Sequence, residues 1–171
     1  MKIQKYIDYI KESLDIPEEI IDNFQELEDD GIRISYKKVG PNKNLLRHLH
    51  EEGILLSLPI NYFDKFDEIS TIIMNLSNRL ISFQVDERIL YSTMTYYFNY
   101  DKTEKPYHVG NDANNSHLKI GSIDEISNLI KNQNEVIQTH PNQRPRHLAG
   151  VAIRGIKTKI CEIKFYIRPL F

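Results

Sequence analysis

The sequence predicts an α+β fold in a single domain, residues 1–171. Three observations lead to this class: segments with helical apolar spacing, strand-like segments interspersed among them, and a length of 171 residues that suits one domain. The chain has no internal repeat and no linker. We therefore expect a mixed or antiparallel sheet of roughly five to seven strands, with an N-terminal helical pair and further helices packed on one face.

The opening of the chain predicts the helical pair. Residues 3–14 place apolar side chains at helical spacing, with acidic residues on the opposite face. Asp15 can cap a second helix that has Pro17 in its first turn, where the missing amide costs nothing. Gly31 is expected to end that helix, because glycine readily adopts the backbone conformation of a helix C-terminus.

The next part of the chain predicts two strands and two helices. Residues 32–36 alternate apolar and polar side chains, as in a half-buried strand, and residues 54–60 are typical of a buried strand. Between them, residues 44–52 are compatible with a short helix. Residues 65–80 repeat apolar side chains at alternating steps of three and four, the most regular helical pattern in the chain.

A tyrosine-rich segment and a polar segment follow. Residues 81–85 and 89–100 predict a β-hairpin with its turn near Asp86 and Glu87. Residues 101–117 are almost free of apolar side chains, which indicates a long polar loop.

The last part of the chain predicts a helix and two strands. Ser122 and Glu125 form a capping-box pattern at the start of the helix. Residues 151–154 and 160–167 are expected to be strands, and the second alternates Ile163, Phe165 and Ile167 with polar neighbours.

The two ends of the chain carry opposite charge, although the net charge is only −2. Residues 1–30, the acidic helical pair, have a balance of −7, and residues 139–171, the basic C-terminal strands, have a balance of +6. Such asymmetry can mark an anionic partner at the basic end. It also arises where acidic and basic faces contact each other or simply face water.

Several classes of chemistry are disfavoured. The single cysteine, Cys161, excludes a disulfide framework and any multi-cysteine metal site. The sequence has no phosphate-binding loop, dinucleotide fingerprint, HExxH or GxSxG motif. Histidines such as His48 and His50 leave a metal site open, but we expect neither a metal nor a cofactor. No apolar run is long enough for a membrane span.

One tripeptide on the predicted last strand resembles part of a nuclease site. Glu162 and Lys164 match the distal half of a motif in which carboxylates hold magnesium and a lysine polarises the attacked group. The motif also needs an acidic residue on a neighbouring strand, and the sequence offers no convincing one. A solvent-facing pair on a strand is the simpler interpretation, and we assign no catalytic residue.

Residues 139–147 form the most unusual segment, with two prolines that stiffen it. It presents arginines, which suit bidentate capture of phosphate or carboxylate, beside histidines. The alternative is an exposed connector between strands. The candidate anion- or ligand-binding residues are His140, Arg144, Arg146, His147 and Arg154.

The predicted tyrosine-rich strand offers a second candidate surface. Tyrosine is enriched at recognition surfaces, because its ring packs while its hydroxyl stays hydrated. One face of the strand should cover the core and the other could meet a partner or a second copy. Tyr91, Tyr97 and Tyr100 are the candidate partner-binding residues.

Parts of the chain resemble small uncharacterised proteins of large tailed bacteriophages. The likeness rests on Ile16-Pro17-Glu18-Glu19 at the start of the second helix, on the acidic stop with Gly31, and on residues 66–83. It covers about half of the chain and consists of capping and amphipathic patterns. The resemblance implies a viral origin and no catalytic residue.

These observations favour a non-enzymatic protein that acts through protein–protein contacts. It would be a phage accessory, virion-associated or host-factor-binding protein, located in the bacterial cytoplasm or in the virion. Its partner would be another protein or a second copy, and we expect no membrane partner. The alternative is binding or hydrolysis of a phosphorylated small ligand or nucleic acid at residues 139–147, so enzymatic activity stays open.

Overall fold

The computed structural model describes residues 16–40, 52–100, 106–112, 118–133, 135–138, 150 and 152–170, with only the backbone of residues 100 and 106–112. These residues form an α+β structure with a seven-stranded sheet in which every strand pair is antiparallel. The predicted fold class is confirmed. The predicted helices at residues 3–14 and 44–52 lie outside the described residues.

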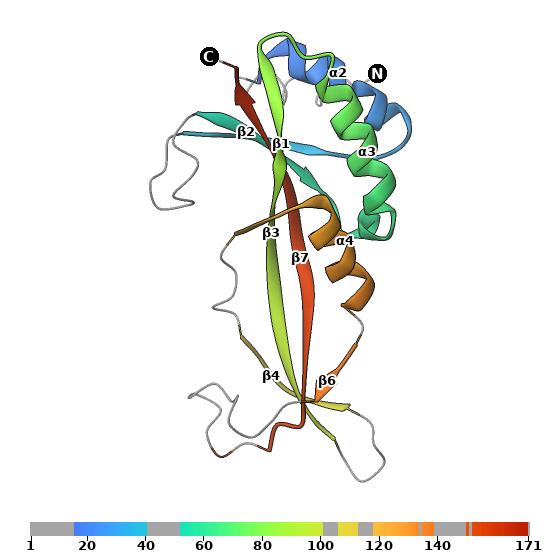
Figure 1. Cartoon of the computed structure of the whole chain (residues 1–171), viewed down its shortest axis with the longest axis vertical. Coiled ribbons are helices and arrows are strands. Elements are labelled where there is room, and N and C mark those ends of the chain that lie inside the picture. The colour runs from blue at the N-terminus through green and yellow to red at the C-terminus, as the bar shows by residue number, and fades with distance from the viewer. Residues whose placement is uncertain are drawn as a thin grey trace, which may run out of the picture.

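The helices and strands alternate along the chain (Figure 1). The helical elements are α2 (Glu18–Asp29), the 3-10 helix η1 (Ile60–Lys65), α3 (Phe66–Ser77) and α4 (Ile123–Asn132). The strands are β1 (Ser35–Val39), β2 (Gly53–Leu58), β3 (Phe83–Tyr100), β4 (Pro106–Asp112), β5 (Lys119–Gly121), β6 (Ile137–Gln138) and β7 (Gly155–Pro169).

Two long strands, β3 and β7, pair with each other along most of their length. The sheet order is β1-β2-β7-β3-β4, with β5 added to β3 and β6 added to β7. Strand β3 has 18 residues and β7 has 15, whereas most strands in globular proteins have about 3–10. Figure 1 shows this pair running almost the whole length of the molecule, with helices beside its upper and middle parts only.

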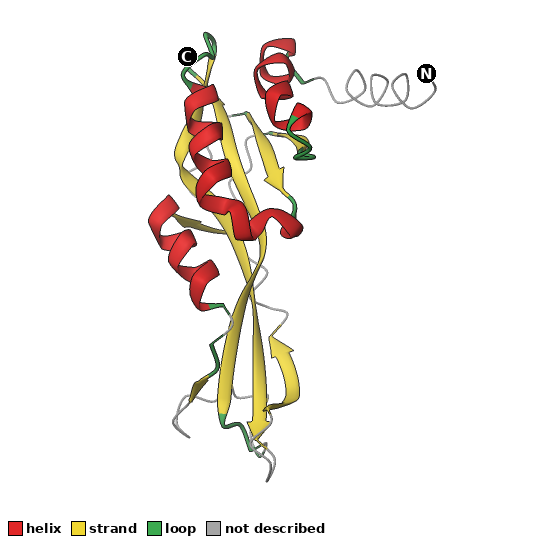
Figure 2. Cartoon of the chain, turned by 90° about the vertical axis from the view of Figure 1, so that its right-hand side faces the viewer, coloured by secondary structure: helices red, strands yellow, loops and turns green. Residues whose placement is uncertain are grey.

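The pair therefore belongs to two regions of the molecule. We call the helix-covered region the head; it comprises α2, η1, α3, α4, β1, β2, β5 and residues 83–92 and 162–169 of the long strands. We call the remainder the arm; it comprises residues 93–100 and 155–161 of β3 and β7, with β4 and β6. In Figure 2 the arm projects below the helices.

The head holds the main hydrophobic core. Apolar side chains of all three described α-helices pack in one cluster with side chains from β2, β3 and β7. Phe66 at the start of α3 stacks on Phe165 of β7, with ring centroids 6.4 Å apart. The predicted alternation of the last strand is confirmed, since Ile163, Phe165 and Ile167 are fully buried in this cluster.

Two local capping signals in the sequence are confirmed, whereas Pro17, predicted to lie in the first turn of α2, is instead its N-cap residue. Gly31 has a φ of 84° and follows α2, its N–H donates to the Glu28 carbonyl, and the Ile32 N–H donates to the Leu27 carbonyl. This pair of bonds is the Schellman motif, in which a left-handed residue closes the helix. At α4, the Ser122 hydroxyl accepts the Glu125 N–H at 3.2 Å.

The predicted hairpin turn at Asp86 and Glu87 is wrong. The chain continues as one strand, with an irregularity between the pairs Val85–Ile167 and Ile89–Phe165. Asp86 stabilises this bulge, because its carboxylate accepts bonds from the backbone N–H, Nε and Nη2 of Arg88 at 2.7–2.9 Å. The Asp86 carboxylate thus binds the backbone N–H and the guanidinium group of Arg88, and the chain continues as a strand through the bulge.

Two further predictions about the arm need correction. Residues 106–112 of the predicted polar loop form β4, because they pair with β3 although few of their side chains are apolar. The predicted final strands at residues 151–154 and 160–167 are replaced by one strand, β7, which begins at Gly155. In both places pairing with β3 decides the structure, and local apolar content does not.

Candidate functional site

Most of the predicted anion-binding residues lie outside the described residues, namely His140, Arg144, Arg146 and His147. Arg154 is described and exposed, just before β7. Its backbone N–H donates to the Phe98 carbonyl at 2.9 Å, which holds the chain beside the end of β3. The structure therefore places Arg154 at the end of the arm that lies away from the head. The anion-binding site predicted at residues 139–147 stays a prediction.

Two of the predicted partner-binding tyrosines, Tyr91 and Tyr97, are buried. Tyr91 is 6% exposed and lies in the core of the head, where its hydroxyl donates to Glu125 Oε1 at 3.1 Å. Burial, followed by the negative charge of Glu125, raises the pKa of the Tyr91 hydroxyl. Tyr97 is also 6% exposed. Neither ring is presented to solvent, and the side chain of Tyr100 lies outside the described part.

Glu162 and Lys164 form an ion pair, with Nζ and Oε1 2.5 Å apart. Both side chains point to the sheet face opposite Ile163, and the lysine side chain is only 16% exposed. Among the described residues no group of three or more histidine, cysteine, aspartate or glutamate side chains could hold a metal ion. The contacts of Glu162 and Lys164 are therefore those of a structural ion pair within β7.

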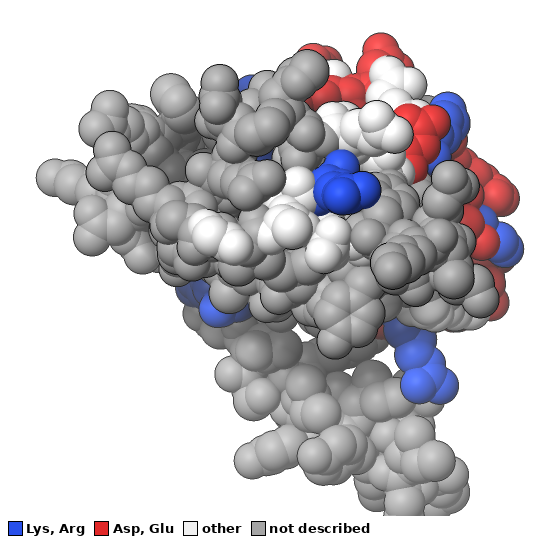
Figure 3. Space-filling view, turned by 90° about the horizontal axis from the view of Figure 1, so that it is seen from below, with Lys and Arg blue, Asp and Glu red and all other residues white. Residues whose placement is uncertain are grey.

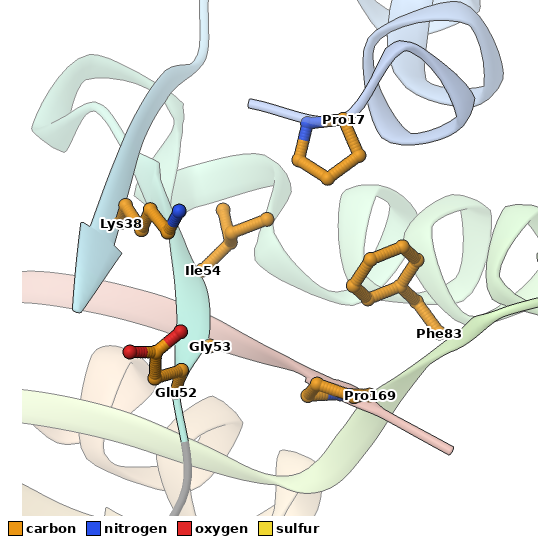
Figure 4. A pocket seen from close by; sticks show the side chains of 7 residues that line it. All are labelled: Pro17, Lys38, Glu52, Gly53, Ile54, Phe83 and Pro169. Carbon is orange, nitrogen blue, oxygen red and sulfur yellow. The ribbon is translucent and has the colours of Figure 1, made fainter. Parts of the chain in front are cut away.

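A small pocket lies at the top of the head (Figure 4). Its volume is about 220 Å³, below the roughly 300–1,000 Å³ of most small-molecule sites. In Figure 4, Lys38 and Glu52 lie on one side of it and Phe83 and Pro169 on the other. The lining residues are Pro17, Lys38, Glu52, Gly53, Ile54, Phe83 and Pro169. This lining is mainly apolar and carries no arrangement of groups that suggests a reaction.

The arm carries a surface that the sequence analysis did not assemble. In the register of β3 and β7, Met94 stands opposite Lys159, Tyr96 opposite Lys157, and Phe98 opposite Gly155. Side chains two residues apart on a strand share one face, so these groups form a single stripe. We call it the basic–aromatic face, made of Met94, Tyr96, Phe98, Lys157 and Lys159.

The opposite face of β3 is buried. Tyr91, Thr93, Thr95 and Tyr97 of β3 expose between 4% and 9% of their surface, whereas Met94, Tyr96 and Phe98 are half-buried and Lys159 is exposed. The alternation of side chains in residues 89–100 already predicted that this strand has two faces, one of which could contact a partner. Only the position of the core shows that the less buried face of β3 is the one with Met94, Tyr96 and Phe98.

The charge asymmetry of the sequence persists in the structure. Helix α2 has no basic residue, and its acidic residues are Glu18, Glu19, Asp22, Glu26, Glu28 and Asp29. Seen from below, aspartate and glutamate side chains gather along the right-hand side of the molecule, where Figure 1 places the helices (Figure 3). By contrast, residues 154–161, which comprise Arg154 and the β7 part of the arm, carry Arg154, Lys157 and Lys159 and no acidic residue.

Comparisons with known proteins identify no family for the chain and no protein of similar fold. No protein-family model matches the chain, and no curated protein and no solved structure matches it significantly. The resemblance to bacteriophage proteins therefore stays a prediction. Within the described residues, none of the helices combines the length and the apolar character that a membrane span requires.

Proposed function

We propose that this chain is a non-enzymatic protein that binds a protein partner through its arm. The observation that carries the proposal is the basic–aromatic face, which lies on a part of the sheet that none of the described helices covers. Here β4, β3 and β7 form a narrow sheet, which gains stability when an apolar face is covered, so this projecting sheet gains from a partner.

The composition of this face suits a protein interface. Interface cores are enriched in tyrosine, phenylalanine and methionine, and such side chains supply most of the binding energy when they enter a partner's pockets. Here Tyr96 and Phe98 alternate with the buried Thr95 and Tyr97, so their backbone is held by the sheet. A rigid backbone reduces the entropy lost on binding.

The lysines of the face indicate an acidic partner surface. Lys157 and Lys159 lie beside these apolar side chains, and complementary charge speeds encounter and excludes wrong partners. The resemblance to phage proteins adds a viral setting, in which the partner is a virion or host protein. The chain would then work in the bacterial cytoplasm or in the virion.

Binding of nucleic acid or a phosphorylated ligand is the second candidate. Lysines beside aromatic side chains of a sheet also occur on single-strand nucleic-acid platforms. That function requires affinity for single-stranded oligonucleotides that falls steeply as salt increases. The slightly acidic chain, with a net charge of −2, makes the protein partner the better supported of the two.

The test begins with capture of the intact chain from its native cells, followed by reconstitution with the captured protein. Native mass spectrometry and light scattering should then show a complex of fixed stoichiometry. The double variant Tyr96→Glu, Lys159→Glu should abolish it. The matched control is Ile60→Glu, which changes a side chain that is 66% exposed on the head and should leave the complex intact.

Both variants must first show the circular dichroism and unfolding midpoint of the wild-type chain. A complex that survives the arm variant, or a chain that binds only oligonucleotides, would overturn the proposal.

A further inference from the structure

Among the described residues, no strand pairs with the outer edge of β7 along part of the arm. Strand β6 pairs with β7 at Gly155 and Ile156, and β2 pairs with it from Ile163 onward. Between these two pairings, residues 157–160 and Glu162 pair only with β3 among the described residues, and Cys161 lies in the bulge between them. We call this stretch the open edge of β7. A strand edge of this kind presents unpaired N–H and C=O groups that can template another strand.

The open edge is accessible and has the length of an ordinary strand. Six residues at about 3.3 Å each span about 20 Å, close to the most common strand length. Thr158, Lys159 and Cys161 are exposed there. Figure 2 looks at this side of the molecule and shows the lower part of the β3–β7 ribbon standing clear of the described helices.

The side chains along the open edge distinguish its two faces. Lys157 and Lys159 point to the basic–aromatic face, and neither forms an ion pair with an acidic side chain of the described residues. Thr158 and Ile160 point to the other face, where Ile160 joins the core cluster. A strand added here therefore meets positive charge on one face and apolar or β-branched side chains on the other.

Strand β1 has another outer edge, and its charges are arranged differently. Lys37 and Lys38 are consecutive residues of β1, so they point to opposite faces. Lysines on both faces are typical of an edge protected against pairing. On β7 both lysines lie on one face, which favours a partner strand whose acidic residues also lie on one face.

We infer that the open edge of β7 receives an extended, acidic segment of the partner as an added antiparallel or parallel strand. The segment alternates acidic residues, directed at Lys157 and Lys159, with apolar or β-branched residues, directed at the side of Thr158 and Ile160. Backbone bonds along the edge supply affinity, and the two lysines supply selectivity. This inference rests on the proposed function and names the binding mode of the partner.

The only cysteine of the chain is a natural reporter for this edge. Cys161 lies within the open edge and is exposed, so a docked strand should shield it from a thiol reagent. The probe is a synthetic peptide of about seven residues in which glutamate alternates with valine. With the full-length chain, we expect this peptide to slow labelling of Cys161 in a saturable way.

Two control peptides separate strand addition from charge attraction. A peptide with lysine in place of glutamate should not protect Cys161. A glutamate–valine peptide methylated on alternate backbone nitrogens should also fail, because it cannot donate the ladder hydrogen bonds. Equal protection by the methylated peptide would overturn the inference.

Matched variants locate the site. Lys157→Glu with Lys159→Glu should weaken the peptide about tenfold or more, because two attractive cross-strand pairs become repulsive. Lys37→Glu with Lys38→Glu on β1 should leave the affinity unchanged. Loss of binding in the β1 variant alone would place the peptide on the other edge and overturn the inference.

The outcomes also separate the inference from the proposed function. A partner complex that requires Tyr96 and Lys159, with no protection of Cys161 by either the peptide or the partner, would refute strand addition alone. A complex that survives the arm variant Tyr96→Glu, Lys159→Glu would refute both strand addition and the proposed function.

Discussion

In the head, β3 and β7 carry side chains such as Ile89, Phe165 and Ile167, all fully buried under the helices. In the arm, the same two strands carry Thr93 and Thr95 on the corresponding face and Met94 and Tyr96 on the other. The backbone pairing continues from one region to the other, apart from its bulges. What changes is the source of stability.

The head is stabilised by burial of apolar surface, which contributes roughly 25 cal/mol per Å². The arm depends on backbone bonds and cross-strand pairs, such as Thr95 opposite Thr158 with hydroxyl oxygens 3.5 Å apart. Such pairs contribute only about 0.2–1 kcal/mol each. One pair of strands therefore forms core in one region and, in the proposed function, a binding element in another.

The largest expected effect is in the head. Phe165→Ala should lower the free energy of unfolding by about 3–5 kcal/mol, because it removes a fully buried ring that stacks on Phe66. Chemical denaturation measures this change. A loss below about 1 kcal/mol would show that the head core does not carry the stability assigned to it.

A substitution on the other side of the sheet should have a smaller effect. Gly53 of β2 lies under the ring of Tyr166, and a Cβ atom there would collide with Cε2 and Cζ of that ring. Gly53→Ala should therefore destabilise the chain by about 1–3 kcal/mol, measured by chemical denaturation. The matched control is Gly40→Ala, whose Cβ would meet no atom within 4 Å and which should be nearly neutral. Equal effects of the two substitutions would contradict the role of Tyr166.

The bulge in β3 should give a pH-dependent effect. The bond from the Arg88 side chain lowers the pKa of Asp86, so its contribution to stability is present above about pH 4 and is lost as the pH falls through the lowered pKa. Asp86→Asn should cost about 1–2 kcal/mol at neutral pH, and the gap to wild type should close in acid. Denaturation curves at several pH values test this. The neighbouring Glu87→Gln should show no such pattern, and a gap that persists in acid would exclude the carboxylate as its cause.

The smallest global effect is expected in the arm. Tyr96→Ser removes one cross-strand partner of Lys157, so the free energy of unfolding should fall by at most about 1 kcal/mol. Amide exchange should instead accelerate locally in residues 93–98 and 155–160, because the arm can open without the head. Uniform acceleration through β2 and the upper part of β7 would show that head and arm unfold as one unit.

Features with a local cause were predictable from the sequence. Ser122 caps α4 and Gly31 closes α2. Both could be predicted because each capping hydrogen bond joins residues only a few positions apart. The burial of Ile163, Phe165 and Ile167 followed from strand alternation, and helix α3 followed from its apolar spacing. These determinants lie within one helix or one strand, where periodicity and capping act.

Features that depend on pairing between distant residues were decided by the tertiary structure. The sequence could not show that Asp86 stabilises a bulge, that residues 106–112 join the sheet, or that Tyr91 and Tyr97 face the core. The basic–aromatic face exists only because the register of β3 and β7 brings Met94 and Tyr96 beside Lys159 and Lys157. The amino-acid sequence by itself determined the amphipathic character of each segment. The packing of helices on only part of the long strands decided which faces became core and which remained outside the helix-covered core, because burial depends on the position of every other element.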